Sequence, residues 1–186
     1  MPNLSASENV NSEKLYPEQM IASLRSILTT GEADLARSLQ RIAEAARSLT
    51  GAGGAAIALP RDGRIICQTR DGELAPALGT KLDVDSGLSG ECLRTGQVMR
   101  CNDTEKDLRV DTEVCRQLGL RSLAAAPLRG RHRAMGIIAV FSGLPYSFPD
   151  WHLEWLQQLA EVAVAVRAQF DECDKRTDET RRRIAV

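Results

Sequence analysis

The amino-acid sequence predicts an α+β protein, in which helices from both ends of the chain flank an antiparallel sheet. Near both ends, apolar residues recur every three or four positions, which is the period of a helix that buries one face. Between these segments lie short apolar runs separated by turn residues, such as Asp62-Gly63 and Asp71-Gly72. Strands joined in this way pair antiparallel, and helices have to cover the faces of their sheet.

The N-terminal part predicts a tail followed by two helices. Residues 1–16 are polar and lack periodicity, so we expect them to be disordered. A helix is predicted over residues 17–31, because Pro17 suits a first helical turn and Gly31 suits a helix end. The next helix is predicted from residue 33 by an apolar stripe formed by Leu35, Leu39, Ile42, Ala46 and Leu49.

The middle of the chain predicts strands in hairpins with two short helices among them. The two helices are predicted over residues 87–94 and 112–118, where Gly96 and Gly119 stop them. A long apolar helix follows from Ser147 or Asp150. Apolar runs and period-two alternation predict strands over residues 55–59, 64–69, 80–84, 97–102, 122–128 and 134–141.

Three local motifs, in this order, carry a resemblance to a known family. Residues 85–96 read DSGLSGECLRTG, a Gly-rich turn that leads into a short helix. The strand at 122–128 contains Ala-Ala-Ala-Pro and is followed by the apolar strand Gly136–Phe141. Ser147-Phe148-Pro149-Asp150 then opens the last helix. Residues 33–170 therefore resemble a GAF domain, a small ligand-sensing and dimerising module, with residues 171–186 as a charged helical extension.

The resemblance implies a GAF fold with a central sheet of five or six strands. The terminal helices would pack on one face, and the short helices and loops would cover a pocket on the other. Ala124 and Ala126 share a face of their strand, where small side chains leave either a cavity or room for a closer helix. The implied ligand-binding residues are Leu82, Val84, Leu88, Cys92, Cys101, Val110, Cys115, Leu118, Ala124 and Ala126.

Composition excludes several classes of function. A net charge of −1 argues against a nucleic-acid partner, which requires a basic surface. No apolar run approaches the roughly 18 residues of a membrane span, so we expect no membrane partner. Five cysteines without paired spacing indicate a reducing compartment and no zinc site. We therefore expect a cytoplasmic, bacterial-type protein without a metal, and the sequence leaves the cofactor unknown.

Among GAF functions, the residues favour a non-enzymatic sensory module for an unidentified small molecule. Motifs for cyclic-nucleotide binding and bilin attachment are missing: Val110-Asp111 replaces an Asn-Lys pair, and Arg116 instead of His follows Cys115. One alternative is a free methionine sulfoxide reductase or thiol redox sensor using Cys115 with Cys92 or Cys101. Ser89 stands where that reductase group has a cysteine. Another alternative is a purely structural dimerisation domain whose pocket is filled.

The last helix suggests a homodimer. It is apolar over more of its circumference than packing on one sheet requires, and a spacing of four and three continues past Phe170. A short solvated helix is the alternative for its end. We expect self-association through the terminal helices, and an output domain or a kinase is a further candidate partner. The predicted dimer interface comprises Trp155, Leu159, Val162, Ala163, Val166, Phe170 and Cys173.

Overall fold

The computed structural model describes residues 17–26, 34–130 and 133–184. The predicted tail at 1–16 and the predicted helix end at Gly31 lie outside these residues. Helices in the described part are an N-terminal helix over residues 17–26, α2 (Leu35–Thr50), α3 (Gly87–Thr95), α4 (Thr112–Gln117) and α5 (Asp150–Ile184). The strands are β1 (Gly54–Arg61), β2 (Arg64–Gly72), β3 (Met99–Cys101), β4 (Ser122–Arg129) and β5 (Ala134–Ser142).

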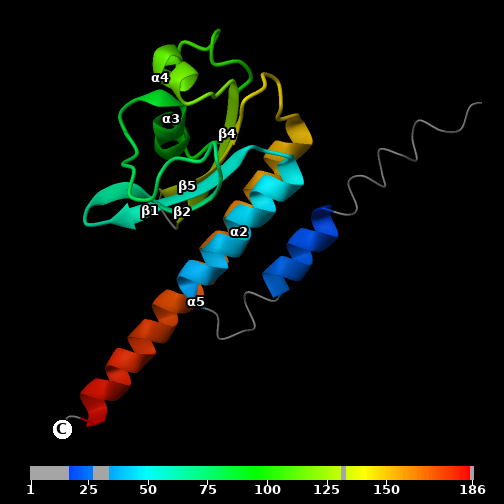
Figure 1. Cartoon of the computed structure of the whole chain (residues 1–186). Helices are drawn as coiled ribbons and strands as arrows, with labels where there is room; N and C mark the ends of the chain where they lie inside the picture. Colours follow the sequence, from blue (N-terminus) through cyan, green and yellow to red (C-terminus); the bar gives the residue numbers. More distant parts are fainter. Residues whose placement is uncertain (1–16, 27–33, 131–132, 185–186) are drawn as a thin grey trace, which may run out of the picture.

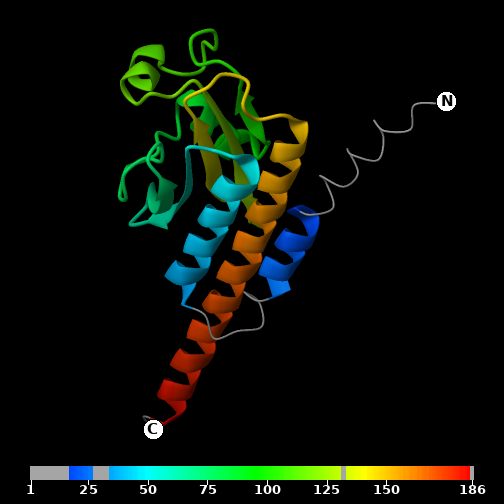
Figure 2. The same ribbon diagram turned by 45° about the vertical axis from the view of Figure 1, so that its right-hand side comes forward.

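The strands form one antiparallel sheet in the order β2-β1-β5-β4-β3, which confirms the predicted α+β class. The β1–β2 hairpin turns at Asp62 and Gly63, whose φ angles of 51° and 74° are those of a two-residue hairpin turn. Figures 1 and 2 show α2, α5 and the N-terminal helix on one face of the sheet and α3 on the other, with α4 above α3 in the view of Figure 1.

Local sequence explains where the helices begin and end. The Asp34 carboxylate caps α2 by accepting from the backbone N–H of Ala36. Gly51 ends the same helix with a φ of 61°, in the left-handed region that glycine adopts without strain. The Asp111 carboxylate caps α4 in the same way, accepting from the N–H groups of Glu113 and Val114.

The larger core lies between the sheet and the terminal helices, and we call it the helix-face core. Leu39 and Ile42 of α2 and Leu156 and Leu159 of α5 are its large, fully buried side chains on the helices. Ile21 of the N-terminal helix is also buried in it. The strands contribute alternate residues to the same core, namely Ala55, Ile57, Leu59, Ala124, Ala126, Leu128, Ile138 and Val140.

This packing corrects the predicted dimer interface. Trp155, Leu159, Val162, Ala163 and Val166 are at most 7% exposed and belong to the core of a single chain. Phe170 is half-buried against the same core, and the side chain of Cys173 lies outside the described residues. The prediction failed because α5 packs against the sheet, α2 and the N-terminal helix at once. Its wide apolar surface is therefore used within one chain.

Two predicted strands also need correction. Residues 80–84 form no strand, only an isolated bridge between Lys81 and Ile66. Hydrogen bonds from Cys67 N–H to Thr80 O and from Leu82 N–H to Ile65 O hold this segment at the edge of β2. The ladder stops there because Asp83 turns the chain, accepting from the N–H of Asp85. The strand predicted at 97–102 is shorter, covering Met99–Cys101.

We expect Leu159→Ala to lower the free energy of unfolding by about 2–5 kcal/mol, because the side chain is 0% exposed and its removal leaves a cavity. Leu144→Ala is the matched control, since Leu144 is 70% exposed and should change stability by no more than about 0.5 kcal/mol. Urea denaturation followed by circular dichroism measures both. Equal losses in the two variants would contradict the assignment of the core.

Candidate functional site

The second face of the sheet carries a smaller core under α3 and the adjoining loops. Leu88 and Cys92 of α3 pack there with Cys101 of β3 and with Leu123 and Ala125 of β4. A Cβ atom at Gly90 would lie 2.7 Å from the carbonyl oxygen of Asp83, so glycine lets α3 lie directly against the segment that precedes it. This close approach brings the loop of residues 73–86 over the sheet.

Beneath that loop lies a cavity of about 150 Å³, which we call the inner pocket. The small side chains of Ala56, Ala58 and Ala139 line it, together with the larger Ile137 and Phe141 of β5. Among its lining residues, only Cys67, Thr80, Lys81 and Ser89 carry polar side-chain groups. The full lining is Ala56, Ala58, Cys67, Pro76, Thr80, Lys81, Leu82, Ser89, Ile137, Ala139 and Phe141.

The ten residues predicted from sequence to bind a ligand lie in different places. Leu82 lines the inner pocket, whereas Val84 lines a separate hollow described below. Leu88, Cys92 and Cys101 are buried in the small core beside the pocket, and Val110 packs against that core. Cys115 is buried in α4, and Leu118, just after α4, is 59% exposed.

Ala124 and Ala126 were placed on the wrong face of the sheet by the sequence prediction. Both belong to the helix-face core, while Leu123 and Ala125 point to the pocket side. Alternation along β4 was predicted correctly, but its phase was not. The strand is buried on both faces from Ser122 to Leu128, so the sequence shows no polar side that would fix the phase.

Sequence reasoning also missed most of the residues that line the inner pocket. Ala56, Ala58 and Ala139 come from the two central strands, whose runs were recognised only as buried strands. One signal was present: in β1 the sequence Ala56-Ile57-Ala58 alternates small and large side chains. The large Ile57 faces the helices and the two alanines face the loop.

The described thiols are buried and have raised pKa values. Cys67, Cys92, Cys101 and Cys115 are all free and buried. Desolvation by burial raises the pKa of the Cys92 thiol to about 12. Burial, followed by the negative charge of Asp107, raises the pKa of Cys101 to about 12. Burial also raises the pKa values of Cys67 and Cys115. Thiolate chemistry requires the opposite shift.

An arginine fastens the loop before α4 to its neighbours. The Arg109 guanidinium lies 2.6 Å from the Asp107 carboxylate, 3.4 Å from that of Glu91 in α3, and donates to the carbonyl of Arg100 over 2.8 Å. The hydrogen bond from Arg109 is the largest cause that lowers the pKa of Asp107 to about 2. These contacts join α3, the end of β3 and the loop into one unit over the sheet.

Comparisons with known proteins identify the family. The family profile described as "GAF domain" matches residues 32–166. This covers more than half of the chain, so the protein belongs to the GAF domain family. A search of curated proteins finds no match to the sequence.

Solved structures with the same fold come from several kinds of protein. The chain is 16% identical to a free methionine-R-sulfoxide reductase from Neisseria meningitidis, with a TM-score of 0.74 over 93% of this chain and 98% of that one. It is 14% identical to the GAF domain of a Coxiella burnetii phosphoenolpyruvate-protein phosphotransferase (TM-score 0.73, covering 87% and 98%). The second GAF domain of DevS from Mycobacterium smegmatis is 24% identical (TM-score 0.59, covering 77% and 99%). These likenesses show the fold alone.

The described residues offer neither a metal site nor a membrane span. Among them, no group of three or more His, Cys, Asp or Glu side chains is arranged to hold a metal ion. None of the described helices is long and apolar enough to cross a membrane.

We expect the four described thiols to react slowly with iodoacetamide at pH 7, because burial keeps them protonated and covered. A Cys173→Ser background limits labelling to these four positions, and peptide mass spectrometry reads each site. The unfolded chain, labelled completely, is the control. Fast labelling of Cys101 or Cys115 in the folded protein would contradict this expectation.

Proposed function

We propose that this GAF domain is a non-enzymatic sensory module that takes a small, mostly apolar molecule into the inner pocket. The observation that supports it is the pocket itself, a cavity of about 150 Å³ lined in part by alanines and covered by the 73–86 loop. An apolar cavity of about this size can hold benzene. The ligand class is therefore a compact molecule of that size, oriented by the few polar groups of Thr80, Lys81 and Ser89.

The cysteines are the reason for proposing that this domain is not an enzyme. Ser89 lines the inner pocket at the position where methionine sulfoxide reductases of this family have a cysteine, and serine cannot form a disulfide. Cys92, Cys101 and Cys115 have raised pKa values, which disfavour the attacking thiolate. Turnover of free methionine sulfoxide with dithiothreitol, lost in Cys115→Ser, would overturn the non-enzymatic assignment and favour the reductase or thiol sensor.

We expect Ala58→Val to abolish benzene binding, because the added methyl groups enter the inner pocket. In the wild-type protein, benzene-saturated buffer should raise the melting temperature and shift the amide resonances of pocket residues, as seen by NMR. Ala58→Val should change stability by less than about 1 kcal/mol and should remove both effects. A wild-type protein that does not respond to benzene would favour the structural domain with a filled pocket.

Ala126→Val supplies the matched control on the opposite face of the sheet. Ala126 is 0% exposed within the helix-face core, so the same substitution forces large neighbours apart. We expect a loss of about 1–3 kcal/mol in the free energy of unfolding. The variant should keep its benzene response below its melting temperature, which separates filling the pocket from weakening the fold.

We further propose that the module acts as a cytoplasmic bacterial homodimer that relays a signal to an output domain or a kinase. The support is α5, which has 35 residues and continues past α2 (Figure 1). Residues 167–184 of α5 span roughly 27 Å. Most helical stability in proteins comes from tertiary packing, which a partner helix would supply to this end of α5. The dimer is thus proposed through the end of α5 and not through the buried residues predicted from sequence.

We expect the full chain to be a dimer at micromolar concentration and a chain lacking residues 171–186 to be a monomer. The reason is that the deleted segment lies beyond the helix-face core, whose buried α5 residues end at Val166. Light scattering after size exclusion gives both masses, and the urea midpoint at low concentration should be equal in the two chains. A monomeric full chain, or a dimeric truncated chain, would contradict the proposed interface.

A further inference from the structure

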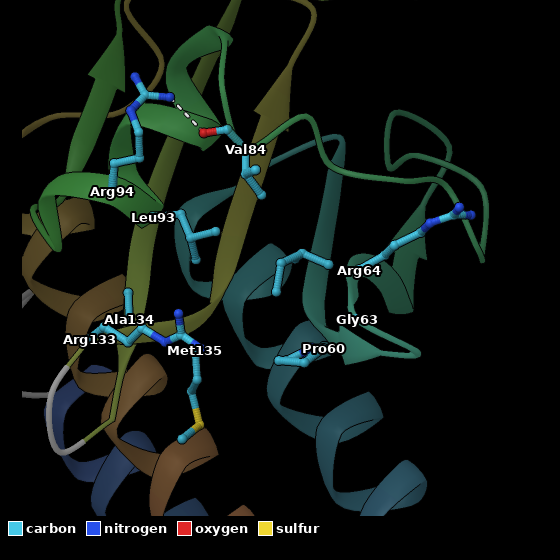
Figure 3. Close-up of a pocket in the computed structure, with 10 residues that line it drawn as sticks. Pro60, Gly63, Arg64, Val84, Leu93, Arg94, Arg133, Ala134 and Met135 are labelled. Atoms are coloured by element: carbon cyan, nitrogen blue, oxygen red, sulfur yellow. Dashed lines mark hydrogen bonds between the residues drawn. The ribbon is translucent and has the colours of Figure 1, made fainter.

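A second hollow opens at the end of the sheet, and we call it the basal hollow. It has a volume of about 470 Å³ and lies between the β1–β2 hairpin, the end of α3 and the start of β5 (Figure 3). It shares no lining residue with the inner pocket. The lining comprises Pro60, Gly63, Arg64, Ile65, Val84, Leu93, Arg94, Arg133, Ala134 and Met135.

The basal hollow is lined by apolar side chains and by arginines. Ile65, Val84, Leu93 and Met135 supply apolar surface, and Ile65 and Leu93 also pack against the small core. Three arginines stand around this surface, each from a different element: Arg64 from β2, Arg94 from α3, and Arg133 from the residue before β5. Figure 3 shows them at separate edges of the hollow, with Arg94 donating to the carbonyl of Val84 over 2.6 Å.

In the described part of the chain these three arginines, like Arg37, Arg61 and Arg129, form no ion pair, whereas six other arginines do. Within the described part of the chain, Arg47, Arg100, Arg109, Arg116, Arg121 and Arg167 all form ion pairs. In the same part of the chain, no carboxylate lies within ion-pairing distance of Arg64, Arg94 or Arg133. The pKa of Asp83 is lowered mainly by hydrogen bonds from Ser86 and Asp85, and the positive charge of Arg94 adds a smaller contribution.

We propose that the basal hollow binds an amphipathic organic anion, a carboxylate attached to a compact acyl body. The apolar body would cover Ile65, Val84, Leu93 and Met135, which gains free energy in proportion to the area removed from water. The carboxylate would be held by the guanidinium group of Arg133, whose planar donors match a carboxylate, and Arg94 adds positive charge from the opposite edge of the hollow. Arg64 adds positive charge from the third side. A volume of about 470 Å³ is within the usual range for small-molecule sites. This site is independent of the function proposed for the inner pocket.

Decanoate, titrated below its micellar concentration into the full-length protein at pH 7, tests the proposal. We expect amide shifts at Val84, Leu93 and Ala134 in ¹⁵N NMR spectra and a Kd that rises with added salt. Decanol, which has the same chain without the charge, should bind at least about tenfold more weakly, since charge-assisted hydrogen bonds are the strong ones.

Three variants separate the charge effect from structural damage. Arg133→Gln should weaken decanoate binding at least about threefold, because one charge-assisted hydrogen bond contributes roughly this much or more. Arg133→Gln combined with Arg94→Gln should weaken it further. Arg37→Gln removes an exposed arginine of α2, outside the basal hollow, and should leave the Kd unchanged.

Several outcomes would overturn the proposal. These are no saturable decanoate binding, equal affinity for decanol, an unchanged Kd in the double variant, or shifts centred on Ala56, Leu82 and Phe141. The last pattern would place the anion in the inner pocket. Because Ala58→Val assigns the benzene response to the inner pocket, failure of one site is distinguishable from failure of the other.

Discussion

The structure depends on a sheet that is buried on both faces. In β4 every side chain from Ser122 to Leu128 is buried, and β1 is buried from Gly54 to Leu59. A sheet of this kind cannot leave one face to water, so the chain has to supply two covers. Three helices supply one cover, and α3 with the loops around it supplies the other. One cover consists of helices and the other largely of loops, and the candidate sites lie on the loop side.

The helix cover is filled by large side chains, whereas the loop cover is not. Leu39, Ile42, Leu156 and Leu159 meet the sheet on the helix side. On the other side, Ala56, Ala58 and Ala139 face a loop that is tied to the edge of β2 by backbone hydrogen bonds. These backbone hydrogen bonds fix the distance between the loop and the sheet, and the short alanine side chains do not fill the space between them. A cavity results, because close packing requires volume as well as apolar character.

The sequence predicted elements whose ends are set by local chemistry. Gly96 ends α3 in the left-handed conformation, and the Asp62-Gly63 turn joins β1 to β2, both as expected. Such signals act over a few residues and can be read without the fold.

The site was less predictable because it depends on relations between distant residues. The phase of Ala124 and Ala126 is set by register with β5, where Ala124 pairs with Val140 and Ala126 with Ile138. The apolar circumference of α5 fits a dimer seam or a crowded monomer core equally well. Only the positions of α2 and the N-terminal helix decide between them.

One short segment connects the two hollows. Leu82 lines the inner pocket and Val84, two residues on, lines the basal hollow. The carbonyl of Val84 accepts a hydrogen bond from Arg94, and Leu82 is bonded to β2 through its N–H. The same short stretch of backbone thus borders an apolar cavity on one side and a hollow edged by arginines on the other.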